Sequence, residues 1–193
     1  MNYKLTQGSD SGMICGGVMD VFFDYISPEP HLIMIGAGHV GGNIVKIAKI
    51  CDFNVTVIDS RKDLLDKIKS DNVSGVNIIV SDFSEIHKKI ELKGGCYVIV
   101  ATNSHENDEK ALYSVLHGNP DFIGMIGSKT KARAIFKNLI EKGIPEERVM
   151  SISCPLGIDI GAETESEVAL SIVAEVVAQL HGASGGFLGI NKL

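Results

Sequence analysis

Residues 32–41 read LIMIGAGHVG, a short apolar run followed at once by three glycines in the spacing GxGxxG. Gly36 permits a tight turn, Gly38 lets the backbone approach a pyrophosphate, and Gly41 allows a helix to pack closely on the strand. The unpaired N–H groups and the positive end of that helix then point at the phosphate. The stretch therefore predicts a strand, a turn and a helix amino terminus that together bind a phosphate-bearing ligand.

The chain after this turn has the spacing of a dinucleotide-binding unit. A second apolar run ends at Asp59, 18 residues after Gly41, where a carboxylate can accept hydrogen bonds from a ribose diol. Arg61 can contact an adenine face or an extra phosphate, although such an arginine is more often a solvated surface residue. Strand, turn, helix, strand and acid in this order predict a Rossmann-type domain; the alternative is an empty loop in a retained scaffold.

Strand and helix patterns alternate along the rest of the chain. Short apolar runs without strict alternation are typical of strands covered on both faces, and right-handed crossovers between them make a parallel sheet. The predicted fold class is α/β, a Rossmann-like doubly wound parallel sheet with a short N-terminal β arm. The predicted strands are 32–35, 55–58, 76–80, 97–101 and 122–126, and the predicted helices are 40–51, 62–70, 105–117 and 129–142.

A last helix is predicted to begin after Thr164. The segment TESE, residues 164–167, has the form of a capping box, in which each end satisfies the other's free N–H. An apolar stripe that starts at Val168 predicts packing on the sheet. Polar residues at i+4 spacing, among them Ser171 and Glu175, occupy the opposite face.

Composition divides the chain into three parts. Residues 1–30 are an N-terminal arm and linker, in which the β-forming run 18–26 predicts one strand. Residues 31–182 are the Rossmann-like nucleotide- or cofactor-binding domain, and residues 183–193 are a flexible tail. Because the arm is too short to own a core, its apolar strand predicts pairing across the axis of a homodimer.

The charge balance excludes several classes of partner. The 193 residues carry 18 Lys and Arg against 24 Asp and Glu, a net charge of −6, and the basic residues are scattered. The sequence therefore shows no cluster of positive charge that would bind nucleic acid or an anionic membrane. No apolar run is long enough to span a bilayer, and the first residues lack the character of a leader peptide, so a cytoplasmic location is expected.

Polar side chains also follow the fourth and fifth predicted strands. In a parallel sheet the ligand crevice lies beyond the carboxyl ends of the strands, so Thr102, His105, Gly127 and Ser128 are expected at the same site. Helix capping by Ser104 or Asn103, with Asp108 in the first turn, is the alternative account of this segment. Lys129 is a further anion-binding candidate or a solvated residue. The candidate cofactor-binding residues are Gly36, Gly38, His39, Val40, Gly41, Asp59, Arg61, Thr102, His105, Gly127 and Ser128.

The four cysteines form no CxxC pair and read as reduced thiols. Cys154 opens a loop rich in Pro and Gly that is expected to lie over a site. Cys15 precedes Gly16 and Gly17, whose bare backbone leaves the sulfur approachable, so it is the candidate catalytic residue and a candidate to lie near a metal. A structural thiol is the alternative for both, because free cysteines are usually buried and inert.

Taken together, these motifs resemble the xanthine dehydrogenase accessory protein family of the XdhC and CoxI type. The resemblance runs from about residue 12 to the tail, and several separate motifs occur in the same order. They are CGG at 15–17, PEP at 28–30, GAGHVG at 36–41, DSR at 59–61, the segment 102–108, IGMIGSKTKAR from Ile123, CPLGIDIGAETESEVALSIVAE from Cys154 and HGASGG from His181.

The resemblance implies a chaperone of molybdenum cofactor that is more a cofactor-handling protein than an enzyme. It would hold molybdopterin or its dinucleotide, support maturation to the sulfurated form and deliver it to a molybdenum hydroxylase, with a cysteine desulfurase as a second partner. By analogy residues 36–41 seat a phosphate, and Cys15 lies near the metal end. Two features depart from the family: the preceding domain with its Gly-Ser-Ser-Pro-Arg segment is not among these residues, and the expected Thr-His-x-His reads TNSH at 102–105.

A second hypothesis is an NAD-dependent oxidoreductase of unknown substrate, which would use NAD(P) or another nucleotide. Asp59 favours NAD over NADP in that case, because a carboxylate accepts hydrogen bonds from a free ribose diol. The sequence shows no separate substrate domain and no Tyr/Lys or His/Asp pair for hydride transfer. The chaperone is therefore preferred.

Overall fold

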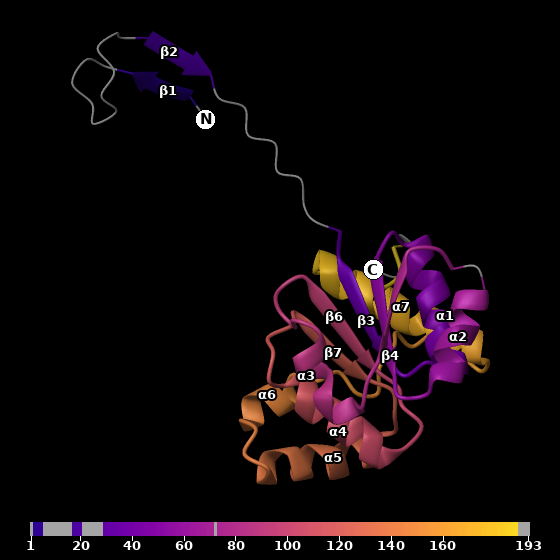
Figure 1. Ribbon diagram of the computed structural model, residues 1–193. Coiled ribbons are helices and arrows are strands. Elements are labelled where there is room, and N and C mark those ends of the chain that lie inside the picture. Colours follow the sequence, from indigo (N-terminus) through magenta and orange to yellow (C-terminus); the bar gives the residue numbers. More distant parts are fainter. Residues whose placement is uncertain (1, 6–16, 21–28, 72, 189–193) are drawn as a thin grey trace.

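The computed structural model describes residues 2–5, 17–20, 29–71 and 73–188. Regular elements account for most of this length, and Figure 1 shows their arrangement. They are β1 (Asn2–Leu5), β2 (Gly17–Asp20), β3 (His31–Ile35), α1 (His39–Ile50), β4 (Asn54–Asp59), α2 (Lys62–Ser70), β5 (Val76–Val80), the 3-10 turn η1 (Phe83–Glu85), α3 (Ile86–Lys89), β6 (Cys96–Val100), α4 (His105–Val115), β7 (Phe122–Met125), α5 (Lys129–Glu141), α6 (Glu146–Met150) and α7 (Glu165–His181).

Five strands form one parallel sheet in the order β5-β4-β3-β6-β7. Within this sheet the first strand along the chain is the central β3. The chain then adds β4 and β5 on one side of β3, and crosses back to add β6 and β7 on the other side. The carboxyl ends of β3 and β6 are in register, with Ile35 opposite Val100. The order reverses between these two strands, which is where open α/β sheets hold their ligands. The predicted doubly wound Rossmann-like fold is confirmed.

Helices cover both faces of the sheet because side chains of a strand alternate between its faces. Leu32 and Met34 of β3 are fully buried against α1, α2 and α7. Ile33 and Ile35 of the same strand are fully buried against the layer of α3, α4, α5 and α6. The two helix layers lie on opposite sides of the sheet (Figure 1).

Four features differ from the sequence expectation. β5 is an edge strand that is only partly covered, with Val80 53% exposed, so this apolar run does not mark a strand buried on both faces. Ser153 forms a parallel bridge with Gly124 and extends the sheet beyond β7. The short segments η1–α3 and α6 were not predicted, because pieces of three to five residues have too few turns to show a helical period.

The N-terminal arm also differs from the single predicted strand. β1 pairs antiparallel with β2, with Asn2 opposite Asp20 and Leu5 opposite Gly17. The predicted strand at 18–26 therefore has described residues only in its first part, where β2 ends at Asp20. The rest of that run lies outside the described residues, and the homodimer stays a prediction.

α7 begins with the predicted capping box. Thr164 accepts a hydrogen bond from the Glu167 N–H at 3.2 Å, and Glu167 accepts one from the Thr164 N–H at 2.9 Å. Two residues of the polar stripe face the protein and not solvent: Ser171 is 7% exposed, and Glu175 accepts hydrogen bonds from the Ser153 hydroxyl and the Gly157 N–H. α7 thus holds the segment after β7 in place. Within the described ranges, no helix has the length and apolar character to cross a bilayer.

Candidate functional site at the carboxyl edge of the sheet

The glycine turn between β3 and α1 is packed tightly at two positions and open at the third. Gly36 has φ +109°, and a Cβ built there would collide with the Ala101 carbonyl at the end of β6. A Cβ on Gly41 would collide with the Gly36 carbonyl. A Cβ on Gly38, in contrast, would meet nothing within 4 Å. Gly36 and Gly41 therefore hold the turn against the sheet, and Gly38 presents bare backbone to the outside.

The amino terminus of α1 has no side-chain cap, a feature that it shares with α2 but not with α4, α5 or α7. Gly38 is its N-cap residue and no side chain accepts from the first turn. Ser104 caps α4, Ser128 caps α5 and Thr164 caps α7, each accepting a backbone N–H. Helix amino termini attract anions because their first N–H groups lack intrahelical partners. The α1 terminus is thus available for an external acceptor.

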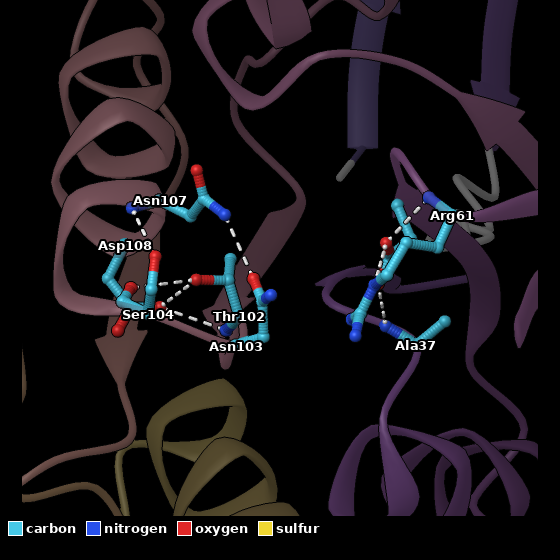
Figure 2. Close-up of polar contacts among 8 residues, drawn as sticks. Ala37, Arg61, Thr102, Asn103, Ser104, Asn107 and Asp108 are labelled. Carbon is cyan, nitrogen blue, oxygen red and sulfur yellow. Dashed lines mark hydrogen bonds and ion pairs between the residues drawn. The ribbon is translucent and has the colours of Figure 1, made fainter.

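Asp59 lies at the end of β4 with its carboxylate fully buried under the turn. One oxygen accepts from the Ala37 N–H at 2.7 Å, and the Arg61 guanidinium forks across both oxygens at 3.0 and 2.9 Å (Figure 2). Burial by itself raises the pKa of this carboxyl, but the hydrogen bonds from Arg61 and Ala37 outweigh it and hold the pKa below its ordinary value. The charged carboxylate therefore ties the turn to β4, and its contact with a ribose stays a prediction.

A second polar cluster stands across the strand ends, at the start of α4 (Figure 2). Asp108 is fully buried, and its Oδ1 accepts from the Thr102 N–H at 2.9 Å and from the Thr102 hydroxyl at 2.7 Å. Its Oδ2 forms an ion pair with Lys131 of α5 and has no hydrogen-bond donor beyond that among the described residues. His105 is exposed at the first position of α4. The expected helix capping by Ser104 is confirmed, but Asp108 faces the strand ends.

Two hollows open on either side of the glycine turn. One of about 320 Å³ lies between α1 and α2 and is lined by Gly38, Lys46 and Lys67 among others. The other, of about 420 Å³, lies over the ends of β6 and β7 and is lined by Gly41, Thr102, Gly127 and Lys131 among others. Both volumes are in the range of small-molecule sites.

Gly38, His39 and Glu165 belong to both hollows. His39 Nδ1 lies 3.6 Å from the Glu165 carboxylate, and both side chains are largely exposed. Val40 lines the second hollow only. The amino termini of α1 and α7 therefore meet at the point where the two hollows join, so one elongated ligand could extend into both.

Cys51, Cys96 and Cys154 lie within the described residues, and all three are free thiols. Cys154 is half-buried, and its thiol donates to the Gly127 carbonyl at 3.6 Å. Burial raises the pKa of this thiol, more than the nearby Lys131 lowers it. Cys15 lies outside the described residues, so its proximity to a ligand stays a prediction. No group of three or more His, Cys, Asp or Glu side chains suited to a metal ion occurs in the ranges that the structure describes.

The structure brings together Gly36, Gly38, Gly41, Thr102 and Gly127 as predicted from sequence, and adds two side chains that sequence reasoning missed. Lys131 is 16% exposed and lines the second hollow, whereas Lys129, the lysine singled out from sequence, is exposed to solvent. Glu165 lies at the mouth of both hollows. Lys131 falls three residues after the Ser128 cap, on the first turn of α5, which is the one sequence signal that could have identified it.

Comparisons with known proteins agree with the Rossmann-like fold. Residues 32–176 match the model of the XdhC Rossmann domain. The chain is 31% identical over 182 residues to the uncharacterized protein YqeB of Escherichia coli, and 27% identical over 159 residues to a probable xanthine dehydrogenase subunit of Bacillus subtilis. A crystal structure of a xanthine dehydrogenase from Bacillus halodurans superposes with a TM-score of 0.69 at 26% identity.

These relatives are longer than the chain. The matches cover 94% and 82% of the chain but only 33% and 45% of the two relatives, and the structural match covers 81% of the chain and 44% of the Bacillus halodurans protein. The chain thus spans less than half the length of the relatives that it matches.

Proposed function

Because the chain belongs to the XdhC Rossmann-domain family, we propose that it binds molybdenum cofactor and assists its sulfuration and its insertion into a molybdenum hydroxylase of the xanthine dehydrogenase type. The names of the relatives from Bacillus subtilis and Bacillus halodurans support a client of that type. In this proposal the chain handles the cofactor and the client carries out the chemistry.

The observation that carries the proposal is the open amino terminus of α1. Its first-turn N–H groups have no side-chain cap, and Gly38 leaves the approach to them free. A phosphate satisfies such groups and is attracted by the helix dipole. Molybdopterin ends in a phosphate, and its dinucleotide form carries a pyrophosphate, so either form offers the group that this turn binds.

The residues around the turn fit the rest of such a ligand. The hollows on both sides of Gly38 give room for the body of the cofactor on one side and for a nucleotide on the other. Thr102 and Lys131 would face the body of the cofactor, while Gly38 and the α1 amino terminus would hold its phosphate. When bound, the cofactor supplies the redox-active molybdenum that the client hydroxylase uses.

The test is Gly38→Val, with binding of AMP, NAD and molybdenum cofactor measured by calorimetry. The valine fills the open approach without a clash in the fold, so binding of all phosphate-bearing ligands is expected to be lost. Gly94→Val is the matched control, because Gly94 precedes β6 at the opposite edge of the sheet and has room for a Cβ. Equal affinity of the native and Gly38→Val proteins would exclude the turn as the site.

The same titration separates the two functions weighed from sequence. Tight binding of cofactor, with weak binding of NAD, agrees with the chaperone. Tight and specific binding of NAD, with no binding of cofactor, would instead indicate an NAD-dependent oxidoreductase.

A further inference from the structure

We propose that Lys131 binds a second anionic group of the ligand whose phosphate lies at the α1 amino terminus. The inference rests on the proposed function, because the phosphate site is the same. It deepens that function by assigning the ligand class: a compound with a phosphate at one end and a charged, oxygen-rich group at the other. The two ends would face opposite walls of the 420 Å³ hollow.

The neighbours of Lys131 fix the position of its side chain. A Cβ on Gly127 would lie only 2.9 Å from Lys131 Cδ, so the absence of a side chain at Gly127 lets the lysine fold back over the end of β7. The ammonium then meets the buried Asp108, whose other oxygen is fixed by two hydrogen bonds from Thr102. Three residues, one each from α4 and from the segments that follow β6 and β7, thus fix one cation.

The ammonium of Lys131 has hydrogen-bonding capacity to spare. A lysine ammonium has three N–H donors. Asp108 takes one, and the Ile126 carbonyl, at a long 3.4 Å, takes a second. The residues that the structure describes supply no partner for the third, although Lys131 is only 16% exposed and lines the hollow. A ligand oxygen in the hollow would complete its coordination.

A contribution to stability does not explain the ion pair of Asp108 and Lys131. Removing two charges from water costs about as much as their attraction returns, so a buried ion pair rarely stabilises a fold over apolar residues of the same size. Here the pair stands over the ends of β6 and β7, across the strand ends from the open α1 amino terminus. Two sites for negative charge therefore face one hollow, one made of backbone N–H groups and one of a side chain.

The experiment compares two probes on the same variants. AMP carries a phosphate and no second anionic group, whereas molybdenum cofactor released from a purified molybdoenzyme carries both a phosphate and an oxygen-bearing metal end. Lys131→Met is expected to weaken retention of the cofactor roughly 10- to 100-fold, as for loss of a charge-assisted hydrogen bond. It should leave the affinity for AMP within about twofold. Retention is measured by gel filtration, from pterin fluorescence and molybdenum content of the protein fraction.

Two further variants keep the result interpretable. Lys129→Met removes the same charge from the same helix at an exposed position, and should change neither affinity. Should the lone Asp108 carboxylate unfold Lys131→Met, the double variant Lys131→Met/Asp108→Asn removes both charges and leaves an amide oxygen to accept from Thr102. The double variant is expected to lose the cofactor and keep AMP.

Either of two outcomes would overturn the inference. Cofactor retention unchanged in the folded variants shows that Lys131 does not contact the ligand. An equal loss of AMP and cofactor shows a general effect on the hollow. Failure of the proposed function looks different, because Gly38→Val would then bind AMP as the native protein does.

Discussion

The two halves of the sheet use the same strand-helix-strand construction but treat the helix amino terminus in opposite ways. In the β3–α1–β4 half, α1 begins at a glycine with no capping side chain. The carboxylate of Asp59, at the end of β4, accepts hydrogen bonds from Ala37 and Arg61. In the β6–α4–β7–α5 half, Ser104 and Ser128 cap both helices, and the ion pair of Asp108 and Lys131 lines the hollow. Backbone donors are thus offered on one side and a side-chain donor on the other.

A helix amino terminus can accept an external anion only where no side chain already accepts from its first-turn N–H groups. A serine hydroxyl at the N-cap position satisfies the N–H groups that a phosphate needs. Three variants test this contrast between the two halves of the sheet.

The largest effect on stability is expected from Gly36→Ala, which disrupts the contact between the glycine turn and the end of β6. The new methyl group would collide with the Ala101 carbonyl, and alanine is strained at φ +109°. We expect a loss of about 3 kcal/mol or more in the free energy of unfolding, measured by urea denaturation. Gly38→Ala is the control, with a loss of about 1 kcal/mol or less, because its methyl group meets nothing and only the poorer N-cap preference of alanine acts. Similar values for the two variants would contradict the packing described at the turn.

An intermediate effect is expected from Asp59→Asn, and it depends on pH. The pKa of Asp59 is below its ordinary value of 3.8 in the folded chain, so the charged carboxylate stabilises the fold above about pH 4, and this contribution is lost as the pH falls through the folded pKa. At pH 7 the variant should lose about 1–2 kcal/mol of unfolding free energy, since Arg61 and Ala37 then lack a charged acceptor.

The measurement for Asp59 is urea unfolding between pH 2 and 7. The difference between native and Asp59→Asn proteins should shrink toward the acid end, while Asp71→Asn, which removes an exposed partner of Lys46, should show little difference at any pH. A gap that stays constant below pH 4 would show that the charge of Asp59 contributes nothing.

The smallest change in stability is expected from Gly38→Ser, which gives α1 the kind of cap that α4 and α5 have. Serine at an N-cap stabilises by a few tenths of a kcal/mol over glycine, and the open space at Gly38 accepts its side chain. The same hydroxyl occupies donors that the phosphate needs, so AMP should bind about tenfold more weakly. Thermal melts with and without AMP measure both effects. A more stable variant that binds AMP with native affinity would show that the phosphate does not use the N–H groups that the serine caps.

Much of the fold could be predicted from the sequence, since the apolar runs and the glycine turn are local signals. The predicted strand 76–80 and helix 62–70 match β5 and α2 to the residue, and the other strands and helices predicted with both ends differ by one or two residues at their ends. The short segments η1, α3 and α6 were not predicted. The pairing of β1 with β2 was missed because two short strands far apart in sequence carry no shared period. The partial exposure of β5 follows from strand order, which local patterns do not encode.

The site was less predictable, because its polar contacts cross between elements. The spacing from Gly41 identified Asp59, but not the fork of Arg61 that occupies both of its oxygens. Asp108 and Lys131 are 23 residues apart and meet only because β6 and β7 lie side by side with α4 and α5 on the same face. Neither residue type nor local period signals such a pair.

The position of α7 in the chain sets the order in which the site can be assembled during synthesis. The glycine turn is synthesised before α7, but α1 packs most extensively on α7, the last helix that the structure describes, and α7 also brings Glu165 to both hollows. Glu175 of the same helix fastens the segment after β7. A nascent chain therefore presents the turn before α7 has emerged to complete the walls of the two hollows.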